Sequence, residues 1–250
     1  GAERTVFAGP MSDPRALLGR MQSVGDLGAI DAMRTLRTAG RRTFDDDRLR
    51  QWLNRYATYS GSSPEQAPAT LACISHVESH YGCWYPRGGL QALRDAFVRV
   101  AEQVGVEMRT GCEVTSILST PDRVTGVRLA DGSVVDASIV VSNADAAHLY
   151  GDLMNDEAAF EKVCKAPRST SGFVMCIGAR GRTPGIEHHN GWFPTEAWHE
   201  FREIDAGRLA SDPTIYACVS SVTDPSQAPE GDENWFVLVN SPPGITVDGE

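Results

Sequence analysis

The residues with the spacing of metal ligands are His76, Glu78 and His80. On a strand all three side chains would share one face, and on a helix the two histidines would lie one turn apart. No third or fourth ligand is evident near them, and the adjacent pair His188 and His189 sits in an expected loop, where neighbours seldom both reach one ion. The sequence therefore predicts no metal site.

Gly88 and Gly89 stand before an expected helix, where free backbone N–H groups can bind an anion or a carbonyl. The alternative is a simple helix entry. None of the 24 glycines is separated from another by a single residue, so the G-x-G-x-x-G loop that holds a dinucleotide pyrophosphate does not occur. The sequence also has no nucleophile elbow, P-loop or H-E-x-x-H motif, and the catalytic residues stay unknown.

Composition limits the partners of the chain. Its 250 residues carry a net charge of -10, which argues against nucleic acid, because a phosphate backbone calls for clustered Lys and Arg. The first fifty residues are richer in Arg and the last fifty are acidic. This asymmetry could orient the protein on an anionic membrane, although solvated helix faces are the alternative.

The six cysteines lie far apart without a C-x-x-C pair or a secretory leader, which predicts reduced thiols and a cytoplasmic protein. No apolar run approaches the length of a membrane span, so we expect any membrane contact to be peripheral, on the inner face.

The first part of the chain reads as helical. We expect two helices between Asp13 and Thr38, broken near residues 25–28, and a clearer helix over 45–59 with apolar residues at helical spacing. A turn follows at 60–64, and the apolar stretch 70–77 belongs to connections and helix.

From Trp84 the pattern changes. Residues 85–89 open a helix with one apolar stripe, which Gly105 ends; the stripe comprises Leu90, Leu93, Phe97, Val100 and Val104. Short strands follow at 106–110, 114–118, 124–129, 134–135 and 139–141, with a hairpin turn at Asp131 and Gly132. This order predicts an α/β sheet with a meander attached.

The last part predicts a second sheet. Its strands are expected at 173–177, 215–219 and 236–239, with a helix at 195–203. Changes of character near residues 84 and 150 divide the chain into 1–83, 84–150 and 151–250.

One ordered set of short motifs supports a family resemblance. It comprises Gly82-Cys83-Trp84-Tyr85-Pro86-Arg87-Gly88-Gly89-Leu90, Gly105-Val106-Glu107, Val114-Thr115-Ser116-Ile117, Gly126-Val127, Asp131-Gly132 and Val140-Val141-Ser142-Asn143-Ala144-Asp145. This order resembles the middle of phytoene and carotenoid desaturase-like flavoproteins, which share a fold with the amine oxidases. Further motifs extend the resemblance over nearly the whole chain, most weakly over the first forty residues.

The resemblance implies an α/β (α+β) fold in which FAD is held by three separated stretches. Only the middle one, 84–150, is found here; the N-terminal glycine fingerprint and the C-terminal flavin motif are absent. Residues 1–83, mostly helical, and 151–250, mixed sheet and helix, would build a substrate domain. We therefore expect an internal part of a longer flavoprotein, which by itself is inactive and of doubtful FAD affinity.

The resemblance also assigns cofactor contacts. Arg87, Gly88 and Gly89 would approach the flavin, and Val114 would meet the adenine through its backbone. Asn143, Ala144 and Asp145 would lie near the cofactor edge. Plain strand packing is the alternative for Val114, and a helix N-cap is the alternative for Asp145.

Members of the resembled family use FAD to remove hydrogen from carbon–carbon bonds of carotenoid precursors, so the implied partners are a hydrophobic polyisoprenoid and a membrane surface. Phe173, Trp192, Phe193 and Trp198 would line a tunnel or face the membrane, or else belong to an ordinary core. Two other functions stay open: a non-catalytic isoprenoid-binding or interaction module without FAD, and a related flavin oxidoreductase of amines or retinoids. The oligomeric state is open as well.

Overall fold

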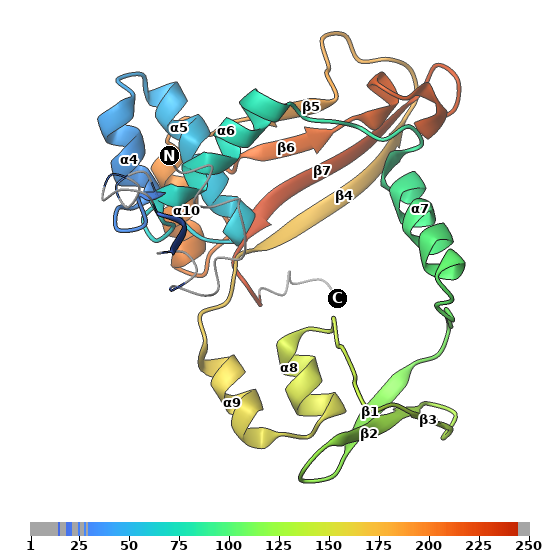
Figure 1. Cartoon of the computed structure of the whole chain (residues 1–250). Helices are drawn as coiled ribbons and strands as arrows, with labels where there is room; N and C mark the ends of the chain where they lie inside the picture. The colour runs from blue at the N-terminus through green and yellow to red at the C-terminus, as the bar shows by residue number, and fades with distance from the viewer. Residues whose placement is uncertain (1–14, 16–18, 22–24, 26–27, 29, 245–250) are drawn as a thin grey trace. The chain divides into compact units, whose positions relative to one another are not determined.

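The computed structural model describes residues 15, 19–21, 25, 28 and 30–244. The chain forms two compact units (Figure 1): the first unit combines residues 1–93 with 169–250, and the second unit comprises 94–168. The helix pair expected between Asp13 and Thr38 lies largely outside the described residues.

Two capped helices begin the described part of the first unit. Helix α4 (Leu36–Thr43) starts after Thr35, whose side chain accepts a hydrogen bond from the Thr38 N–H group. Helix α5 (Asp47–Arg55) is capped in the same way by Asp46 and continues into the short helix η1 (Tyr56–Ser60). The helix predicted over 45–59 is therefore confirmed, with its end tightened into a 3₁₀ turn.

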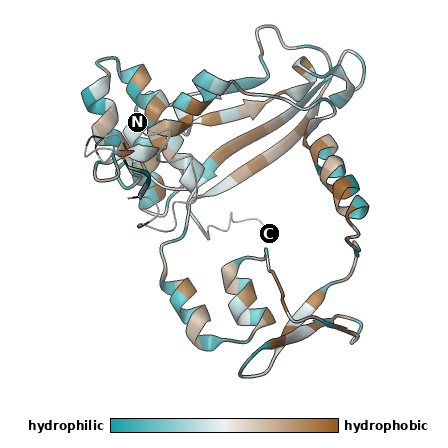
Figure 2. Ribbon diagram, viewed as in Figure 1, coloured by the Kyte–Doolittle hydropathy of each residue, from teal (hydrophilic) through white to brown (hydrophobic). Residues whose placement is uncertain are grey.

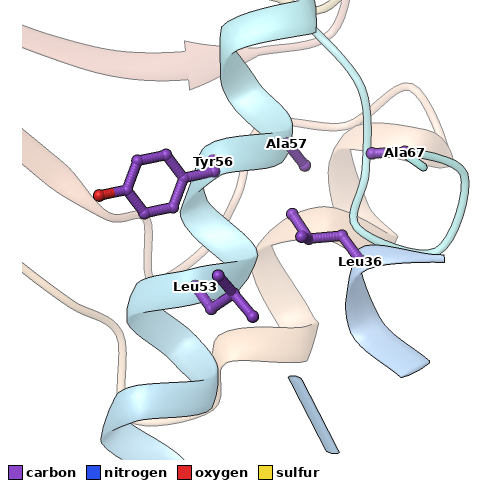
Figure 3. Close-up of a cluster of buried hydrophobic side chains, with 5 residues drawn as sticks. All are labelled: Leu36, Leu53, Tyr56, Ala57 and Ala67. Atoms are coloured by element: carbon purple, nitrogen blue, oxygen red, sulfur yellow. The ribbon is translucent and has the colours of Figure 1, made fainter. Parts of the chain in front are cut away.

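A small hydrophobic core joins these helices to the next segment (Figure 3). It consists of Leu36, Leu53, Tyr56, Ala57 and Ala67, all buried. The Leu36 N–H group donates to the Ala67 carbonyl at 2.8 Å, which fixes the connection that leads to η2 (Ala69–Leu71) and α6 (Ala72–Tyr81). The predicted helical character of residues 70–77 is thereby confirmed.

A four-stranded antiparallel sheet completes the first unit, in the order β4-β7-β6-β5. Strand β4 (Ser171–Ala179) pairs along its whole length with β7 (Glu233–Ser241), and Figure 2 shows hydrophobic residues along both. Strand β6 (Ile215–Cys218) lies between β7 and β5 (His189–Trp192), and helix α10 spans Ala197–Asp205. Short helices η4 (Ser220–Val222) and η5 (Pro225–Gln227) precede β7.

The sheet predicted for the last part of the chain is confirmed. Three of its four strands, β4, β6 and β7, lie where they were expected. Strand β5 was expected to be a loop, because His-Asn-Gly-Trp has neither apolar alternation nor β-branched residues. It is an edge strand whose pairing with β6 supplies the missing stabilisation.

The second unit contains the predicted meander. Strands β1 (Val114–Ser119), β2 (Val124–Leu129) and β3 (Val134–Asp136) pair antiparallel, with the turn at Asp131 and Gly132 between the last two. Three short helical segments follow: α8 (Ala146–His148), η3 (Leu149–Leu153) and α9 (Glu157–Lys165). Helix α7 (Gly89–Gln103) crosses the boundary between the units and confirms the helix predicted to end before Gly105.

The predicted α/β sheet around this meander does not form. Residues 106–110 and 139–141 are not strands, and Val106, Ile139 and Val141 are 51%, 79% and 90% exposed. Among the described residues no strand lies beside either segment, and a strand without a partner leaves its backbone hydrogen bonds unmade. The observed class is a mixed α and β fold with two antiparallel sheets.

The apolar stripe of α7 has the predicted helical spacing but is uncovered. Leu90 and Val104, at its two ends, are 75% and 73% exposed, and Leu93, Phe97 and Val100 between them are exposed as well. Periodicity thus predicted the helix correctly, whereas burial of its stripe needs a covering element that the described residues do not provide.

All six cysteines are free. Burial raises the pKa of the Cys73 thiol above its ordinary value, so this side chain stays protonated at neutral pH.

Candidate functional site

The first unit contains a cleft of about 720 Å³ between its helices and its sheet. This volume lies in the range of small-molecule sites. The lining comes from α5, η1 and α6 on one side and from β5, β6 and β7 on the other: Trp52, Arg55, Tyr56, Thr58, Tyr59, Glu78, Cys83, His189, Asn190, Gly191, Phe193, Tyr216, Leu238 and Asn240.

Aromatic rings make much of the cleft wall. Trp52 packs edge-on against Tyr56 with ring centroids 5.3 Å apart, and Tyr56 stacks on Tyr59 at 5.8 Å. Both distances lie in the range of favourable aromatic pairs. With Phe193 and Leu238 they give a mainly hydrophobic lining.

One carboxylate interrupts this aromatic wall. Glu78 on α6 accepts hydrogen bonds from the hydroxyl groups of Tyr56 at 2.6 Å and Tyr59 at 3.0 Å. Burial first, and then the hydrogen bond to Glu78, raise the pKa of both phenols. Both tyrosines therefore remain protonated donors at neutral pH.

A histidine–tyrosine pair lies on the sheet side of the cleft. His189 Nδ1 is 2.8 Å from the Tyr216 hydroxyl, and the rings stack with centroids 6.0 Å apart. Burial lowers the pKa of His189, the neighbouring His188 lowers it further, and Glu78 opposes the shift. Burial also raises the pKa of Tyr216 to about 12, so both groups are neutral at pH 7.

Arg55 links the cleft to a buried carboxylate. Its guanidinium group bonds Glu200 at 3.0 Å and also the Asn240 side chain. Glu200 is 1% exposed and accepts a second hydrogen bond from Thr214 Oγ1 at 2.6 Å. A buried charge needs such partners, so this network compensates Glu200.

The residues that were considered as metal ligands, and for which the sequence predicted no metal site, make different contacts. Glu78 is engaged with two tyrosines, while the rings of His76 and His80 stack at 5.2 Å. His188 and His189, adjacent in sequence, do come together with rings 4.5 Å apart.

Together with Cys218, these two histidines form a group of three possible metal ligands, whose ligand atoms all lie within 4.8 Å of one another. In the described part of the chain it is the one group of His, Cys, Asp or Glu side chains with this geometry. Nδ1 of each histidine already makes a hydrogen bond, with Thr223 and Tyr216 respectively.

The predicted flavin contacts Arg87, Gly88 and Gly89 lie in the first unit, where α7 begins. Both glycines have positive φ angles, 83° and 75°, which disfavour any other residue. A Cβ atom at Gly89 would lie 3.3 Å from the Tyr85 hydroxyl, which is buried without a partner among the described residues. This segment fits a group that approaches the backbone closely and bonds a phenol, although Gly88 N–H here donates to Asp224 at 3.0 Å.

The other predicted contacts lie in the second unit. Val114 begins β1 and pairs with Leu129, and Asn143, Ala144 and Asp145 are exposed. Asp145 accepts a hydrogen bond from Ala147 N–H at 2.8 Å and so caps α8. This is the helix N-cap that was the alternative to a cofactor contact for this residue. Cofactor contact by these residues stays a prediction.

Sequence reasoning did not find the cluster of Glu78, Tyr59, His189 and Tyr216. Glu78 was considered only for metal binding, and Tyr59 as the last residue of the helix predicted over 45–59. The sequence signal that could have indicated the cluster is the presence of polar residues within otherwise apolar segments. Glu78 and His189, however, are more than a hundred positions apart, and no sequence pattern pairs residues at that separation.

Comparison with known proteins identifies the family. The family described as flavin containing amine oxidoreductase matches residues 32–242. The 4,4'-diaponeurosporene oxygenase of Staphylococcus haemolyticus is 37% identical over 96% of this chain and 48% of its own length. The hydroxyneurosporene desaturase of Cereibacter sphaeroides is 36% identical over 97% and 49%.

A further relative, the 1-hydroxycarotenoid 3,4-desaturase of a Flavobacterium species, is 38% identical over 80% of this chain and 41% of its own length. The chain thus spans about half the length of the curated relatives it matches. The predicted resemblance to carotenoid desaturases is confirmed.

A solved structure supports the fold. An oxidoreductase from Methanosarcina mazei superposes with a TM-score of 0.63 at 19% identity, covering 90% of this chain and 52% of that one. From the matched residues and the relatives together, the chain belongs to the flavin containing amine oxidoreductase family.

Proposed function

We propose that the protein containing this chain is an FAD-dependent desaturase of carotenoid precursors or related isoprenoids. The observation that carries the proposal is the alignment of relatives named as carotenoid desaturases along 80% and 97% of this chain. When bound, FAD supplies the redox chemistry by accepting hydride equivalents. The chain itself supplies orientation, hydrophobic walls and exclusion of water.

In this proposal residues 84–150 contribute to the FAD-binding part, and 1–83 with 151–250 form the substrate part. The positive φ angles of Gly88 and Gly89 and the unpartnered Tyr85 hydroxyl support a flavin contact at the start of α7. Arg87, which is exposed there, adds a positive charge. Val114, Asn143, Ala144 and Asp145 would contribute from the second unit.

The cleft of the first unit is the proposed place for part of the isoprenoid. Its aromatic wall suits a hydrocarbon chain, since burial of apolar surface is the main driving force that such a ligand offers. Phe193 lines this cleft and Phe173 lines a second one of about 390 Å³ between β4, β7 and Pro213. Trp198 instead stacks on the Arg37 guanidinium group at 3.5 Å.

We also propose a peripheral contact with the membrane in which such a substrate dissolves. No helix in the described part of the chain combines the length and hydrophobicity of a membrane span. Flotation of the protein with anionic and zwitterionic vesicles tests the contact: the proposal predicts co-flotation, and recovery of all protein in the dense fraction with both would overturn it.

The decisive experiment uses a protein extended to the length of the relatives. After purification with FAD, the expected result is a retained flavin absorbance band and anaerobic bleaching of that band by an acyclic carotene, with a product that has one more conjugated double bond. Retention of a carotenoid without flavin would favour the non-catalytic module, and bleaching by amines alone would favour an amine oxidoreductase.

A matched pair of variants tests the flavin contact. Gly89→Ala should lose most of the flavin band, because its Cβ would crowd Tyr85 and Gln227. Gly231→Ala has a similar φ angle of 82° but open space around it, and it should retain the band. Equal flavin content in the two variants would contradict a cofactor contact at Gly89.

A further inference from the structure

We propose that the polar cluster in the cleft, formed by Glu78, Tyr59 and His189, recognises a terminal hydroxyl group on the isoprenoid substrate. The inference rests on the proposed function for the identity of the long apolar ligand. The new element is the functional group at the end of that ligand, a hydroxyl.

The cleft is a poor match for a pure hydrocarbon. A hydrocarbon has no hydrogen-bonding group, yet this hydrophobic cleft contains a carboxylate, phenols and an imidazole. A hydrocarbon that displaced water from them would leave part of their hydrogen-bonding capacity unused. A ligand with one polar end would satisfy these groups while its chain covers the aromatic wall.

The helical side of the cleft has acceptor positions to spare. Tyr56 and Tyr59 each donate to a different oxygen atom of Glu78, at 2.6 Å to Oε2 and 3.0 Å to Oε1. A carboxylate has about four acceptor positions, so Glu78 can accept a further hydrogen bond. The Tyr59 oxygen, which uses its proton on Glu78, also remains an acceptor.

His189 can supply a donor on the sheet side of the cleft. Nδ1 of His189 pairs with the Tyr216 hydroxyl at 2.8 Å. When that hydroxyl donates, the neutral imidazole carries its proton on Nε2 and can donate to a ligand. Glu78 and His189 both line this cleft, so acceptor and donor belong to one cluster.

A hydroxyl group matches this arrangement because it can both donate to Glu78 and accept from His189. A carbonyl group only accepts, and it would leave the Glu78 acceptor positions unused. A carboxylate would face Glu78 with a like charge. The geometry therefore favours an alcohol over the other common oxygen functions.

The experiment compares two substrates in the protein extended to the length of the relatives: an acyclic carotene and its 1-hydroxy derivative. Dissociation constants and kcat/KM are measured for both. We expect the wild-type protein to bind the hydroxylated compound about tenfold more tightly, the effect of one hydrogen bond to a carboxylate.

Three variants locate the preference. Glu78→Gln, Tyr59→Phe and His189→Phe should each reduce the ratio of the two affinities toward one, while affinity for the carotene is retained. A merely structural role of these residues would reduce both affinities together. Thr58→Val is the matched control, because the Thr58 hydroxyl lines the same cleft but already donates to the Arg55 carbonyl at 2.8 Å.

The two proposals fail in distinguishable ways. Equal affinity of the wild-type protein for both compounds, or a preference that survives in all three variants, would overturn the inference even if both are desaturated. A preference that the variants abolish, without formation of any new double bond, would uphold the inference and overturn the desaturase function.

Discussion

The hydroxyl group of Tyr56 donates a 2.6 Å hydrogen bond to Glu78 and so ties η1 to α6 at the edge of the cleft. Tyr56 is 6% exposed and also belongs to the hydrophobic core. One side chain thus connects the core to the candidate site.

Replacement of Tyr56 by Phe should lower the free energy of unfolding by about 1–2 kcal/mol, because a buried hydrogen bond to a carboxylate is lost. Tryptophan fluorescence in urea measures this change, since all five tryptophans belong to the first unit. Tyr59→Phe removes a hydroxyl from a residue that is 68% exposed and should cost less. An equal loss for the two variants would contradict this assignment.

Removal of Arg55 should be among the most destabilising single changes near the cleft. Arg55→Met leaves the buried Glu200 carboxylate without its cation, at a cost of about 3 kcal/mol. The double variant Arg55→Met with Glu200→Gln should recover part of this loss, because no uncompensated charge remains. Additive effects of the two substitutions in urea unfolding would disprove the coupling.

Gly61 joins the two stretches of chain that form the first unit. Its φ angle is +60°, and a Cβ atom there would lie 2.4 Å from Ser169 Cβ. Gly61→Ala should therefore cost about 2–3 kcal/mol, from backbone strain together with the clash.

Gly207→Ala separates these two causes. Gly207 has a φ angle of +73° but nothing within 4 Å of its would-be Cβ, so its substitution should cost only about 1 kcal/mol. If both variants had the same melting temperature, the close approach to Ser169 would have no energetic role.

Glu233 should make the stability of the first unit depend on pH. Burial alone would raise the pKa of this carboxyl, but hydrogen bonds from Thr183 N–H, Thr183 Oγ1 and Trp235 Nε1 lower it overall. A folded-state pKa below the unfolded value of about 4.3 stabilises the fold above that value, and this stabilisation is lost as the pH falls through the folded-state pKa.

Urea unfolding from pH 6 to pH 3 measures the effect. The wild-type protein should lose more unfolding free energy over this range than Glu233→Gln, and the difference should appear below about pH 4.3. Parallel stability curves would show that Glu233 has the same pKa in the folded and unfolded states.

The elements that depend on local pattern could be predicted from sequence. Leu49, Trp52, Leu53 and Tyr56 recur at helical spacing, and the helix with its Asp46 cap is found where they predict it. The Asp131-Gly132 turn and the strands on either side were equally predictable, because glycine at positive φ and short β-branched runs act over a few residues.

Burial was not predictable from the same patterns. Val106, Ile139 and Val141 are as apolar as residues of true strands, but they are exposed and unpaired in the described structure. A strand forms only where another backbone accepts and donates its hydrogen bonds, so its existence depends on residues distant in sequence.

The sequence by itself determined the family, the meander, most helices and the absence of a dinucleotide loop within these residues. Only the tertiary structure placed Glu78 beside Tyr56 and Tyr59 and His189 beside Tyr216, and it also made His189 part of a strand. The reason is physical: periodicity encodes which face of an element is apolar, whereas the meeting of polar groups across a cleft depends on how separate elements pack.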